Sequence, residues 1–452
     1  MPSTPQVAQP PLEVVKHKAA PVVRQGGPTD PSHDDRLRRG IIHTDVSRRV
    51  AIGMSAAFLL LIVAIPVGQA VLEAIRGEES LLLDIFRRMP TRENLKQFED
   101  DLDNVSYAKN AVQPRMQDLL TAWGRVGNKK AVVGHNGWLY YKPGITFLGG
   151  PDFLDHDTLE GRAKAALEAG EPAGNPDPRV AIFAFNAALA RRGIKLVVFP
   201  VPDKAMLTPL ALHGRGDASR PLEVPRNPGW QQFLSDLREH GVEVFDPAPA
   251  ALKPGEPPRF LAQDTHWTPA WMKDVAQQLA ARVVAVGALA PVSSEAASAR
   301  RRTVTLPMER VGDVVDMLKL PADQTTFVPQ RISIEQVQDA DGSPWKPNRD
   351  AEVLLLGDSF TNVFSLDSMG WGTAAGLAPH LALALGRDLD VIAQNDSGAF
   401  ATRVALAREL GGDDGARRLT GKKVVIWEFA SRELAVGDWK PVDWQAVMPG
   451  DK

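Results

Sequence analysis

The sequence of 452 residues contains no cysteine. This absence excludes a disulfide framework, a cysteine nucleophile and a thiolate metal site in one step. A protein exported from the cytoplasm meets an environment in which free thiols risk oxidation, so a chain without cysteine is compatible with export but does not establish it.

The chain also lacks an excess of basic charge. Its formal net charge is −3 and its isoelectric point is near 6.3, so it has no broad positive field to attract a nucleic-acid backbone, and we expect no nucleic-acid partner. The nine histidines form no i, i+4 pair and no close cluster, which disfavours a zinc site. We expect no bound metal and no bound cofactor.

One long apolar run lies near the N-terminus. Residues Val50 to Leu72 contain no charge, and the almost entirely apolar first part of this run is close to the roughly 20 residues that a bilayer-crossing helix needs. A buried helix of a soluble core is the alternative, but such helices usually carry a polar stripe, and this run does not. The run predicts a transmembrane helix.

The charges that flank this run predict its orientation. Arginines precede it, whereas mixed charges follow it, which favours a cytoplasmic N-terminus and places the rest of the chain across the membrane. A cleaved signal peptide, with Gly68-Gln69-Ala70 as the cleavage site, is the competing interpretation, but the long segment before the run makes an unusual leader. We expect an uncleaved signal-anchor. The arginines are Arg36, Arg38, Arg39, Arg48 and Arg49.

Composition divides the chain into four parts. Residues 1–47 are rich in proline and charge and have no periodicity, which predicts a disordered cytoplasmic tail. Residues 48–75 hold the anchor helix, and residues 76–130 show the loose helical spacing of a linker region. Residues 131–450 form one large domain, in which the proline-rich stretch at about 288–349 is expected to be an insertion over the core.

Within the large domain, helical segments alternate with short apolar strands after a hairpin around Asn136-Gly137. This alternation indicates a mostly parallel sheet covered by helices on both faces. The ligand site of such a sheet lies off the carboxyl ends of its strands. The predicted strands are 195–201, 242–245, 353–356, 390–393 and 422–429, and the predicted helices are 180–192, 230–240, 269–286, 373–385 and 401–410.

A serine stands where such a sheet would hold a nucleophile. The apolar strand Val353 to Leu356 runs directly into Gly357-Asp358-Ser359. Gly-Asp-Ser alone is a weak signal, because it is also an ordinary strand-ending turn. To react, a serine hydroxyl needs a base that takes its proton and a carboxylate that orients the base.

Both groups occur in the segment Asp264-Thr265-His266-Trp267, just before the helix that Thr268-Pro269 is expected to begin. In an extended segment, Asp264 and His266 leave the same face with Cα atoms roughly 6.5 to 7 Å apart, which permits a hydrogen bond from the imidazole Nδ1 to the carboxylate. We predict Ser359 as nucleophile, His266 as base and Asp264 as the orienting carboxylate. Together they indicate acyl-group chemistry.

The oxyanion of such a reaction needs hydrogen-bond donors. The backbone N–H of Ser359 is one candidate, and the side chain of Asn395, which follows its own predicted strand, is a candidate for a second. A plain strand-ending turn at Asn395-Asp396 is an equal alternative.

Five segments in this order resemble the SGNH-hydrolase-like domain of the alginate O-acetyltransferase family, of the AlgJ and AlgX type. They are Gly137-Trp138-Leu139-Tyr140, Pro202-Asp203-Lys204-Ala205, Asp264-Thr265-His266-Trp267-Thr268, Leu356-Gly357-Asp358-Ser359-Phe360 and Val425-Ile426-Trp427-Glu428-Phe429. In ordinary SGNH hydrolases the serine block precedes the aspartate-histidine block, whereas here Asp264 and His266 precede Ser359. This permuted order is similar to the acetyltransferase branch.

The resemblance implies a flavodoxin-like, SGNH-hydrolase-like α/β fold and the triad roles given above. It implies a periplasmic O-acetyltransferase, anchored in the inner membrane, that acetylates the hydroxyls of an exported polysaccharide. It also implies two partners: a multi-span acyltransferase that supplies acetyl groups from cytoplasmic acetyl-CoA, and a polymer synthase or export complex. The short segment after Arg432 is similar to the single-domain AlgJ type, without the carbohydrate-binding module of the AlgX type.

Residues outside the triad are expected to have simpler, structural roles. Arg432 resembles a family arginine near the site, but an arginine at a strand end is most often a solvated group or an ion-pair partner. We expect Lys204 to support loop structure. We expect Trp138 and Tyr140 to line the core or a substrate cleft.

Two other functions are open at this point. An acetyl-esterase would share the first half-reaction and differ only because water, not a sugar hydroxyl, meets the acyl-enzyme. A non-catalytic, polymer-binding component of an export complex would use the same cleft without chemistry. The identity of the polysaccharide is open as well.

Overall fold

The computed structural model describes residues 47–87, 89–169, 174–290, 292, 300–395, 397–412 and 415–448. The chain divides into two compact units, one that ends at Ser106 and one that begins at Tyr107; each is described by itself. The predicted disordered tail lies outside the described residues except for Ser47, whose hydroxyl accepts a hydrogen bond from the N–H of Val50 and caps the first helix.

Helix α2 (Arg48–Arg76) contains the long apolar run. Among the described residues it is the one helix long and apolar enough to cross a membrane. Its apolar side chains are exposed, and a surface of this kind needs lipid or protein to cover it. Near its end the helix becomes polar: the buried Gln69 donates to Glu73 Oε1 (2.7 Å) and to the carbonyl of Val105 (3.3 Å). The last turns of α2 therefore pack against protein.

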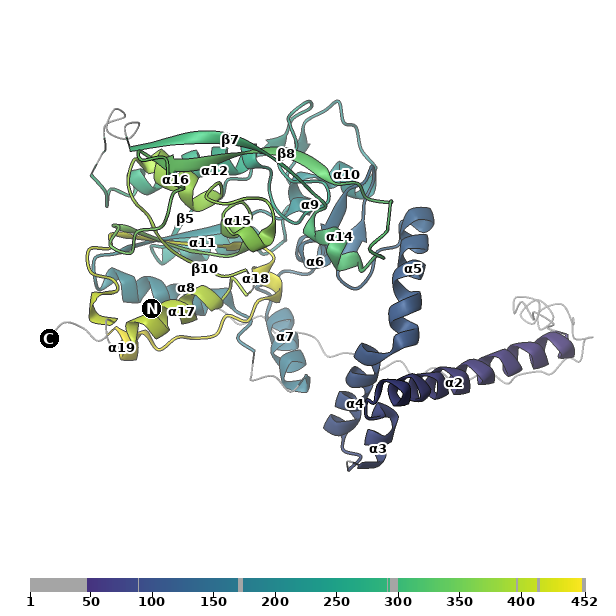
Figure 1. The fold of residues 1–452 in the computed structure, drawn as a ribbon. Helices are drawn as coiled ribbons and strands as arrows, with labels where there is room; N and C mark the ends of the chain where they lie inside the picture. Colours follow the sequence, from purple (N-terminus) through teal and green to yellow (C-terminus); the bar gives the residue numbers. More distant parts are fainter. Residues whose placement is uncertain are drawn as a thin grey trace, which may run out of the picture. The chain divides into compact units, whose positions relative to one another are not determined.

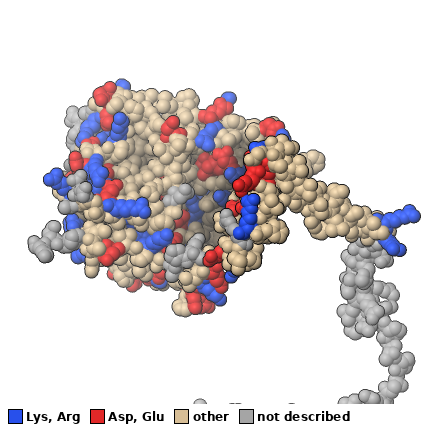
Figure 2. Space-filling view, turned by 60° about the horizontal axis from the view of Figure 1, so that its bottom comes forward, with Lys and Arg blue, Asp and Glu red and all other residues tan. Residues whose placement is uncertain are grey.

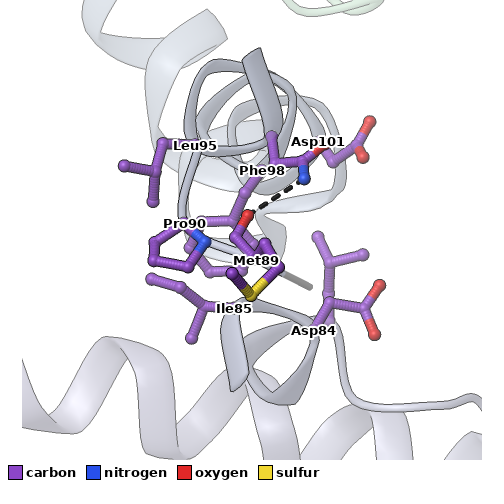
Figure 3. A pocket seen from close by; sticks show the side chains of 9 residues that line it. Asp84, Ile85, Met89, Pro90, Leu95, Phe98 and Asp101 are labelled. Carbon is purple, nitrogen blue, oxygen red and sulfur yellow. Dashed lines mark hydrogen bonds between the residues drawn. The ribbon is translucent and has the colours of Figure 1, made fainter. Parts of the chain in front are cut away.

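The other described elements of the first unit are η1 (Leu81–Leu83), α3 (Asp84–Arg87) and α4 (Arg92–Val105). Figure 3 shows a small pocket between α3 and α4 that is lined mainly by apolar side chains, among them Ile85, Leu95 and Phe98. Its volume of about 20 Å³ is room for about one water molecule. The pocket is a packing gap between two short helices and not a ligand site.

A five-stranded parallel sheet forms the centre of the second unit. Its strands lie in the order β10 (Asp390–Ala393), β9 (Val353–Gly357), β11 (Val424–Ala430), β3 (Lys195–Val201) and β5 (Glu243–Val244). Every residue of β9 and β11 is buried, as a parallel sheet covered on both faces requires. The mostly parallel sheet predicted from the sequence is confirmed.

Helices form a layer on each face of this sheet (Figure 1). One layer contains α12 (Pro269–Ala285) and α16 (Leu377–Leu385), and the other contains α8 (Pro178–Ala190), α17 (Ala401–Leu410) and α19 (Trp444–Val447). The hydroxyl of Thr268 caps α12 by accepting from the N–H of Trp271 (3.4 Å), and Pro269 occupies its first turn. This is the cap that the sequence predicts.

Most predicted boundaries agree with the structure to within two residues, but α16 begins at Leu377 and not at Thr373. The carbonyl of Ala374 accepts from the N–H of Val337 (2.8 Å), and the N–H of Ala375 donates to the carbonyl of Phe364 (2.9 Å). A helix that began at Thr373 would need the Ala374 carbonyl as an acceptor for one of its own N–H groups, but this carbonyl accepts from Val337 instead.

The stretch predicted as an insertion is more regular than its prolines suggest. Strands β7 (Arg301–Arg310) and β8 (Gln330–Asp339) pair antiparallel along their whole length, where the sequence predicts short extended pieces such as Arg331 to Ile334. Pro307 lies within β7. A two-stranded ribbon leaves one edge of each strand unpaired, so a proline there need not remove a ladder hydrogen bond.

The helix between these two strands ties the insertion to the domain. Helix α14 (Asp313–Leu318) packs against the hairpin of β1 (Ala131–Val133) and β2 (Leu139–Tyr141). The contact forms a small second core of Ala131, Leu139, Val314, Val315, Leu318 and Phe327. The first residue of α14 is thereby held beside the site described below.

Three short helices begin within three residues of a central strand: α9 (Lys204–Leu207) after β3, α15 (Ser359–Asn362) after β9 and α18 (Glu433–Val436) after β11. The carboxyl edge of the sheet is therefore lined by helix starts. The remaining elements are α5 (Tyr107–Gly124), α6 (Lys142–Gly149), α7 (His156–Glu168), α10 (Pro209–His213), β4 (Leu222–Glu223), α11 (Trp230–Glu239), β6 (Ala251–Leu252), η2 (Asp367–Met369) and η3 (Gly415–Arg417).

Candidate active site

Ser359 lies at the carboxyl end of β9, in the first turn of α15. Asp358 caps this turn: its Oδ1 accepts from the N–H of Phe360 (2.8 Å), while its Oδ2 accepts from the N–H of Ala430 (2.8 Å) at the end of β11. Gly357 is needed for space, because a Cβ there would lie 2.2 Å from Thr361 Oγ1. The Gly-Asp-Ser sequence thus builds a tight turn from strand to helix with the serine at the sheet edge.

The structure brings the three predicted triad residues into one hydrogen-bonded chain. His266 Nε2 lies 2.8 Å from Ser359 Oγ, and His266 Nδ1 lies 2.6 Å from Asp264 Oδ1. All three side chains are buried. The imidazole is therefore placed to take a proton from the serine while the aspartate fixes its tautomer.

Asp264 is held from several sides. Its Oδ1 also accepts from the N–H of His266 (3.0 Å), and its Oδ2 accepts from Trp371 Nε1 (2.9 Å) and from the N–H of Asp313 (3.1 Å). Burial would raise the pKa of this carboxyl, but the hydrogen bond and charge of His266, together with these donors, hold the pKa well below its usual range. Asp264 is ionised at any physiological pH.

Burial and neighbouring charges also oppose each other in setting the pKa of His266. Burial alone would lower its pKa, but the hydrogen bond to Asp264 and the negative charges of Asp264, Asp313 and Asp358 outweigh burial and raise the pKa above that of an ordinary histidine. Negative charges in these positions favour the protonated form of the imidazole.

Asp313 is a second carboxylate beside His266, and the sequence gives no sign of it. One of its oxygens accepts from the N–H (2.6 Å) and the hydroxyl (3.1 Å) of Thr265, while the other lies 3.7 Å from His266 Nδ1. Its side chain is 29% exposed and faces the cleft. Burial and the neighbouring charge of Asp264 raise the pKa of Asp313 to about 6.

Lys204 is a buried cation behind the aspartate-histidine loop. Its Nζ donates to the carbonyls of Leu139 (2.5 Å), Ala262 (2.8 Å) and Asp264 (3.0 Å), and burial lowers its pKa to about 7. These contacts support the loop, as expected from the sequence. Tyr140 lies in the core, where its hydroxyl donates to the carbonyl of Thr208 (2.9 Å).

Glu428 is a buried acid that contacts the turn carrying Ser359. No sequence pattern marks it as a functional group. Its Oε2 accepts from the N–H of Asp358 (2.9 Å) and from the hydroxyl of Thr361 (2.7 Å). Burial, together with the neighbouring Asp358 carboxylate, raises the pKa of Glu428 well above its usual value. The Glu428 side chain braces the turn that carries Ser359.

The two further candidates, Asn395 and Arg432, both line the cleft in front of Ser359. Asn395 is exposed, and its Oδ1 accepts from Asn362 Nδ2 (2.8 Å). Arg432 is buried and forms an ion pair with Asp203 (3.3 Å). Of the alternatives considered from the sequence, Arg432 is thus an ion-pair partner and not a solvated surface group.

The cleft has a volume of about 510 Å³, which is large enough for a small-molecule or sugar ligand. In the part of the chain that the structure describes, two groups of side chains have metal-like spacing: the exposed set of His156, Asp157 and Glu160, and the site set of Asp264, His266 and Asp313. In the site set, Nδ1 of His266 is already bonded to Asp264, and both Asp264 oxygens accept N–H donors. The contacts favour a proton-transfer chain over a metal site.

A parallel α/β sheet with a serine at its carboxyl edge, bonded through histidine to aspartate, defines a protein of the serine-hydrolase-like class. Residues 131–431 match the family described as the SGNH hydrolase-like domain of the acetyltransferase AlgX, and the chain belongs to that family. The resemblance and the fold class predicted from the sequence are confirmed.

Relatives named "Probable alginate O-acetylase AlgJ" occur in Pseudomonas syringae pv. tomato and in Azotobacter vinelandii. The first is 28% identical over 58% of this chain and 64% of its own length, and the second is 29% identical over 68% of this chain and 70% of its own length. The chain thus spans slightly less than two thirds of the first relative. The solved O-acetyltransferase domain of Pseudomonas putida AlgJ is similar at 20% identity, with a TM-score of 0.47 over 70% of this chain and 96% of that one.

Proposed function

We propose that this protein is a membrane-anchored O-acetyltransferase that moves acetyl groups onto the hydroxyls of an exported polysaccharide. The observation that carries the proposal is the hydrogen-bonded chain from Asp264 through His266 to Ser359 Oγ, with distances of 2.6 and 2.8 Å. Membership of a family of acetyltransferase domains supports acetyl as the acyl group. Relatives named as alginate O-acetylases support a polysaccharide as the acceptor.

In the first half-reaction, Nε2 of His266 takes the proton of Ser359 while Oγ attacks the carbonyl carbon of the acetyl donor. The donor oxygen leaves with that proton, and acetyl-Ser359 remains. In the second, Nε2 takes the proton of a sugar hydroxyl, whose oxygen attacks the acetyl carbon. Ser359 Oγ then leaves and regains a proton. General-base catalysis of this kind contributes roughly 10² to 10⁴-fold to the rate.

The negative oxygen that forms in each half-reaction needs donors. The backbone N–H of Ser359 is the first donor in this proposal. Because the Oδ1 of Asn395 is occupied by Asn362, its own NH₂ group is left to serve as the second. Loss of one such donor costs about 10² to 10³ in rate, so Asn395→Ala tests this assignment.

Helix α2 is the membrane anchor in this proposal. Arg48 and Arg49 at its start would remain on the cytoplasmic side of the inner membrane, and the second unit would lie in the periplasm. An acetyl donor made in the cytoplasm must then cross the membrane, which calls for a multi-span acyltransferase partner. A polymer synthase or export complex would supply the acceptor.

The test uses the full chain in detergent with a chromogenic acetyl ester as donor and a neutral oligosaccharide as acceptor. Mass spectrometry should show acetylated oligosaccharide with the native chain and none with Ser359→Ala. Free acetate without acetylated sugar would instead identify an esterase. In cells, acetylation that survives Ser359→Ala but is lost with the whole chain would identify a non-catalytic component.

A further inference from the structure

The cleft in front of Ser359 carries more negative than positive side chains. Among the described residues that line it, four are aspartate or glutamate and one is arginine, beside the histidine His266. The acidic residues are Asp313, Asp358, Glu433 and Asp438, and the basic residue is Arg432. On the face drawn in Figure 2, basic and acidic side chains are interspersed and do not form a basic track.

The one arginine of the cleft is already paired. Its Nη1 lies 3.3 Å from Asp203 Oδ1, and its guanidinium stacks over the rings of Tyr141 (5.1 Å) and Phe360 (5.8 Å). Burial opposes its charge, but nearby carboxylates, with Asp203 foremost, outweigh burial and raise the pKa of Arg432. A ligand carboxylate would have to compete with Asp203 for this cation.

Two cations near the cleft are paired in the same way. Lys440 Nζ lies 3.6 Å from Asp438 and over the ring of Phe400 (4.5 Å). Arg310 lies 3.6 Å from Asp316, donates to the carbonyl of Met369 and stacks on the Trp371 ring. Neither offers an unpaired positive charge to a substrate.

From this excess of carboxylates we infer that the acceptor is an uncharged glycan and not a polyuronate. The inference rests on the proposed function and specifies its substrate. A polyuronate such as alginate brings one carboxylate per sugar, and a like charge in a partly desolvated cleft is rejected strongly. The polymer in the name of the alginate O-acetylase relatives is therefore not the acceptor that we infer for this chain.

The same side chains suit a neutral sugar. An ionised carboxylate only accepts hydrogen bonds, and sugar hydroxyls donate them. Asp313 and Asp438 are partly exposed in the cleft and are placed to accept from hydroxyls. The apolar faces of a pyranose ring fit the side chains of Met317, Met369 and Phe400, which also line the cleft.

The test compares three acceptors of equal length with the full chain in detergent and a chromogenic acetyl ester as donor. They are an oligomannuronate, the same oligomannuronate after chemical reduction of its carboxylates to alcohols, and a neutral β-1,4-glucan oligomer. The first two share linkage and ring stereochemistry and differ in charge. We expect the carboxyl-reduced and glucan oligomers to be acetylated about tenfold or more faster than the uronate.

A variant at the mouth of the cleft sharpens the comparison. Val436 lines the cleft, is 48% exposed and takes no part in the proposed chemistry. Val436→Lys adds a cation without removing a catalytic group, and Val436→Gln is its uncharged control. Val436→Lys should raise acetylation of the uronate severalfold and leave that of the glucan unchanged, whereas Val436→Gln should change neither.

Three results would overturn the inference: uronate acetylated as fast as its reduced form, no acetylation of either neutral oligomer, or equal effects of Lys and Gln at position 436. A failure of the proposed function itself would be detected by a separate measurement. With the donor alone, before any acceptor is added, neither acetate release nor acetyl-Ser359 formation would then be observed.

Discussion

Two regions of the molecule each place a carboxylate beside Nδ1 of His266. The loop before α12 supplies Asp264 at 2.6 Å, and the start of α14 supplies Asp313 at 3.7 Å. Asp264 accepts four N–H hydrogen bonds and has a pKa far below its usual range, whereas Asp313 has a pKa raised to about 6. One carboxylate is permanently charged, and the other titrates close to neutral pH.

The difference in pKa arises from hydrogen bonding and from the charge of the neighbouring carboxylate, not from residue type. The N–H of Asp313 itself stabilises the charge on Asp264, while the charge of Asp264 disfavours ionisation of Asp313. Two carboxylates that share one histidine are thereby pushed apart in pKa, as is typical when neighbouring acids take different roles. We infer that Asp264 orients the imidazole of His266 and that Asp313 raises the pKa of this imidazole.

Removing the charge of Asp264 should have the largest effect. Asp264→Asn should lower kcat by about 10⁴-fold, the scale seen when the aspartate of a serine triad becomes an amide that favours the wrong tautomer. The measurement is the rate of acetyl-Ser359 formation from a chromogenic acetyl ester, with Ser359→Ala as the blank. If Asp264→Asn keeps a tenth of native activity while Asp313→Asn keeps none, the two assignments must be exchanged.

A smaller effect is expected when Asp264 keeps its charge but loses one donor. Trp371 Nε1 donates to Asp264 Oδ2 at 2.9 Å, and Trp371→Phe removes that hydrogen bond. A buried acceptor that loses a partner costs about 1–3 kcal/mol. The free energy of unfolding should therefore fall by an amount in that range, and kcat should fall because the activation free energy rises by a similar amount. Chemical denaturation and steady-state kinetics measure them, and Trp345→Phe, at another buried tryptophan, serves as the control for lost packing.

Much of the first region could be predicted from the sequence. Asp264 and His266 are two residues apart, so their contact is local, and Ser359 follows a strand whose apolar residues mark it as buried. The alternation of helices and strands placed these segments at one sheet edge. Lys204 and the Thr268 cap of α12 were also visible from local patterns.

The second region could not be predicted. Asp313 lies in a stretch whose prolines and mixed polarity hide a long β-ribbon, and the ribbon depends on pairing between residues as distant as Arg301 and Asp339. The place of α14 depends on a small core that joins Val314 and Leu318 to the distant hairpin residue Leu139. The raised pKa of Glu428 likewise arises only when β9 and β11 lie side by side.

Asp313→Asn should have a modest effect on rate and a clear effect on pH dependence. The charge of Asp313 raises the pKa of His266, and the proposed mechanism needs the neutral imidazole as base. Removing the charge should therefore move the acidic limb of the kcat profile to lower pH, with kcat at pH 8 lowered by about tenfold or less. An unchanged acidic limb would contradict the role given to Asp313.

The same variant has an expected effect on stability. Because the folded-state pKa of Asp313 is raised to about 6 from 3.8, this group contributes stability that is fully present below pH 3.8 and is lost as the pH rises through about 6. Asn carries no such titration. The melting temperature of Asp313→Asn, relative to the native chain, should therefore be higher at pH 8 than at pH 4, as thermal unfolding at both pH values will show.

The smallest expected effect comes from Thr265→Val, which removes one hydrogen bond to Asp313. The hydroxyl of Thr265 donates to Asp313 at 3.1 Å and helps to lower its pKa, while the backbone N–H at 2.6 Å is kept. The substitution should raise the pKa of Asp313, so that this carboxylate is less ionised near neutral pH. Around pH 6 to 7, kcat should then change by about threefold or less.

The decisive measurement combines the two variants. In an Asp313→Asn background, Thr265→Val should leave the pH profile of kcat unchanged. If it shifts the profile there as well, Thr265 acts on His266 by another route, and the separate role of Asp313 loses its support.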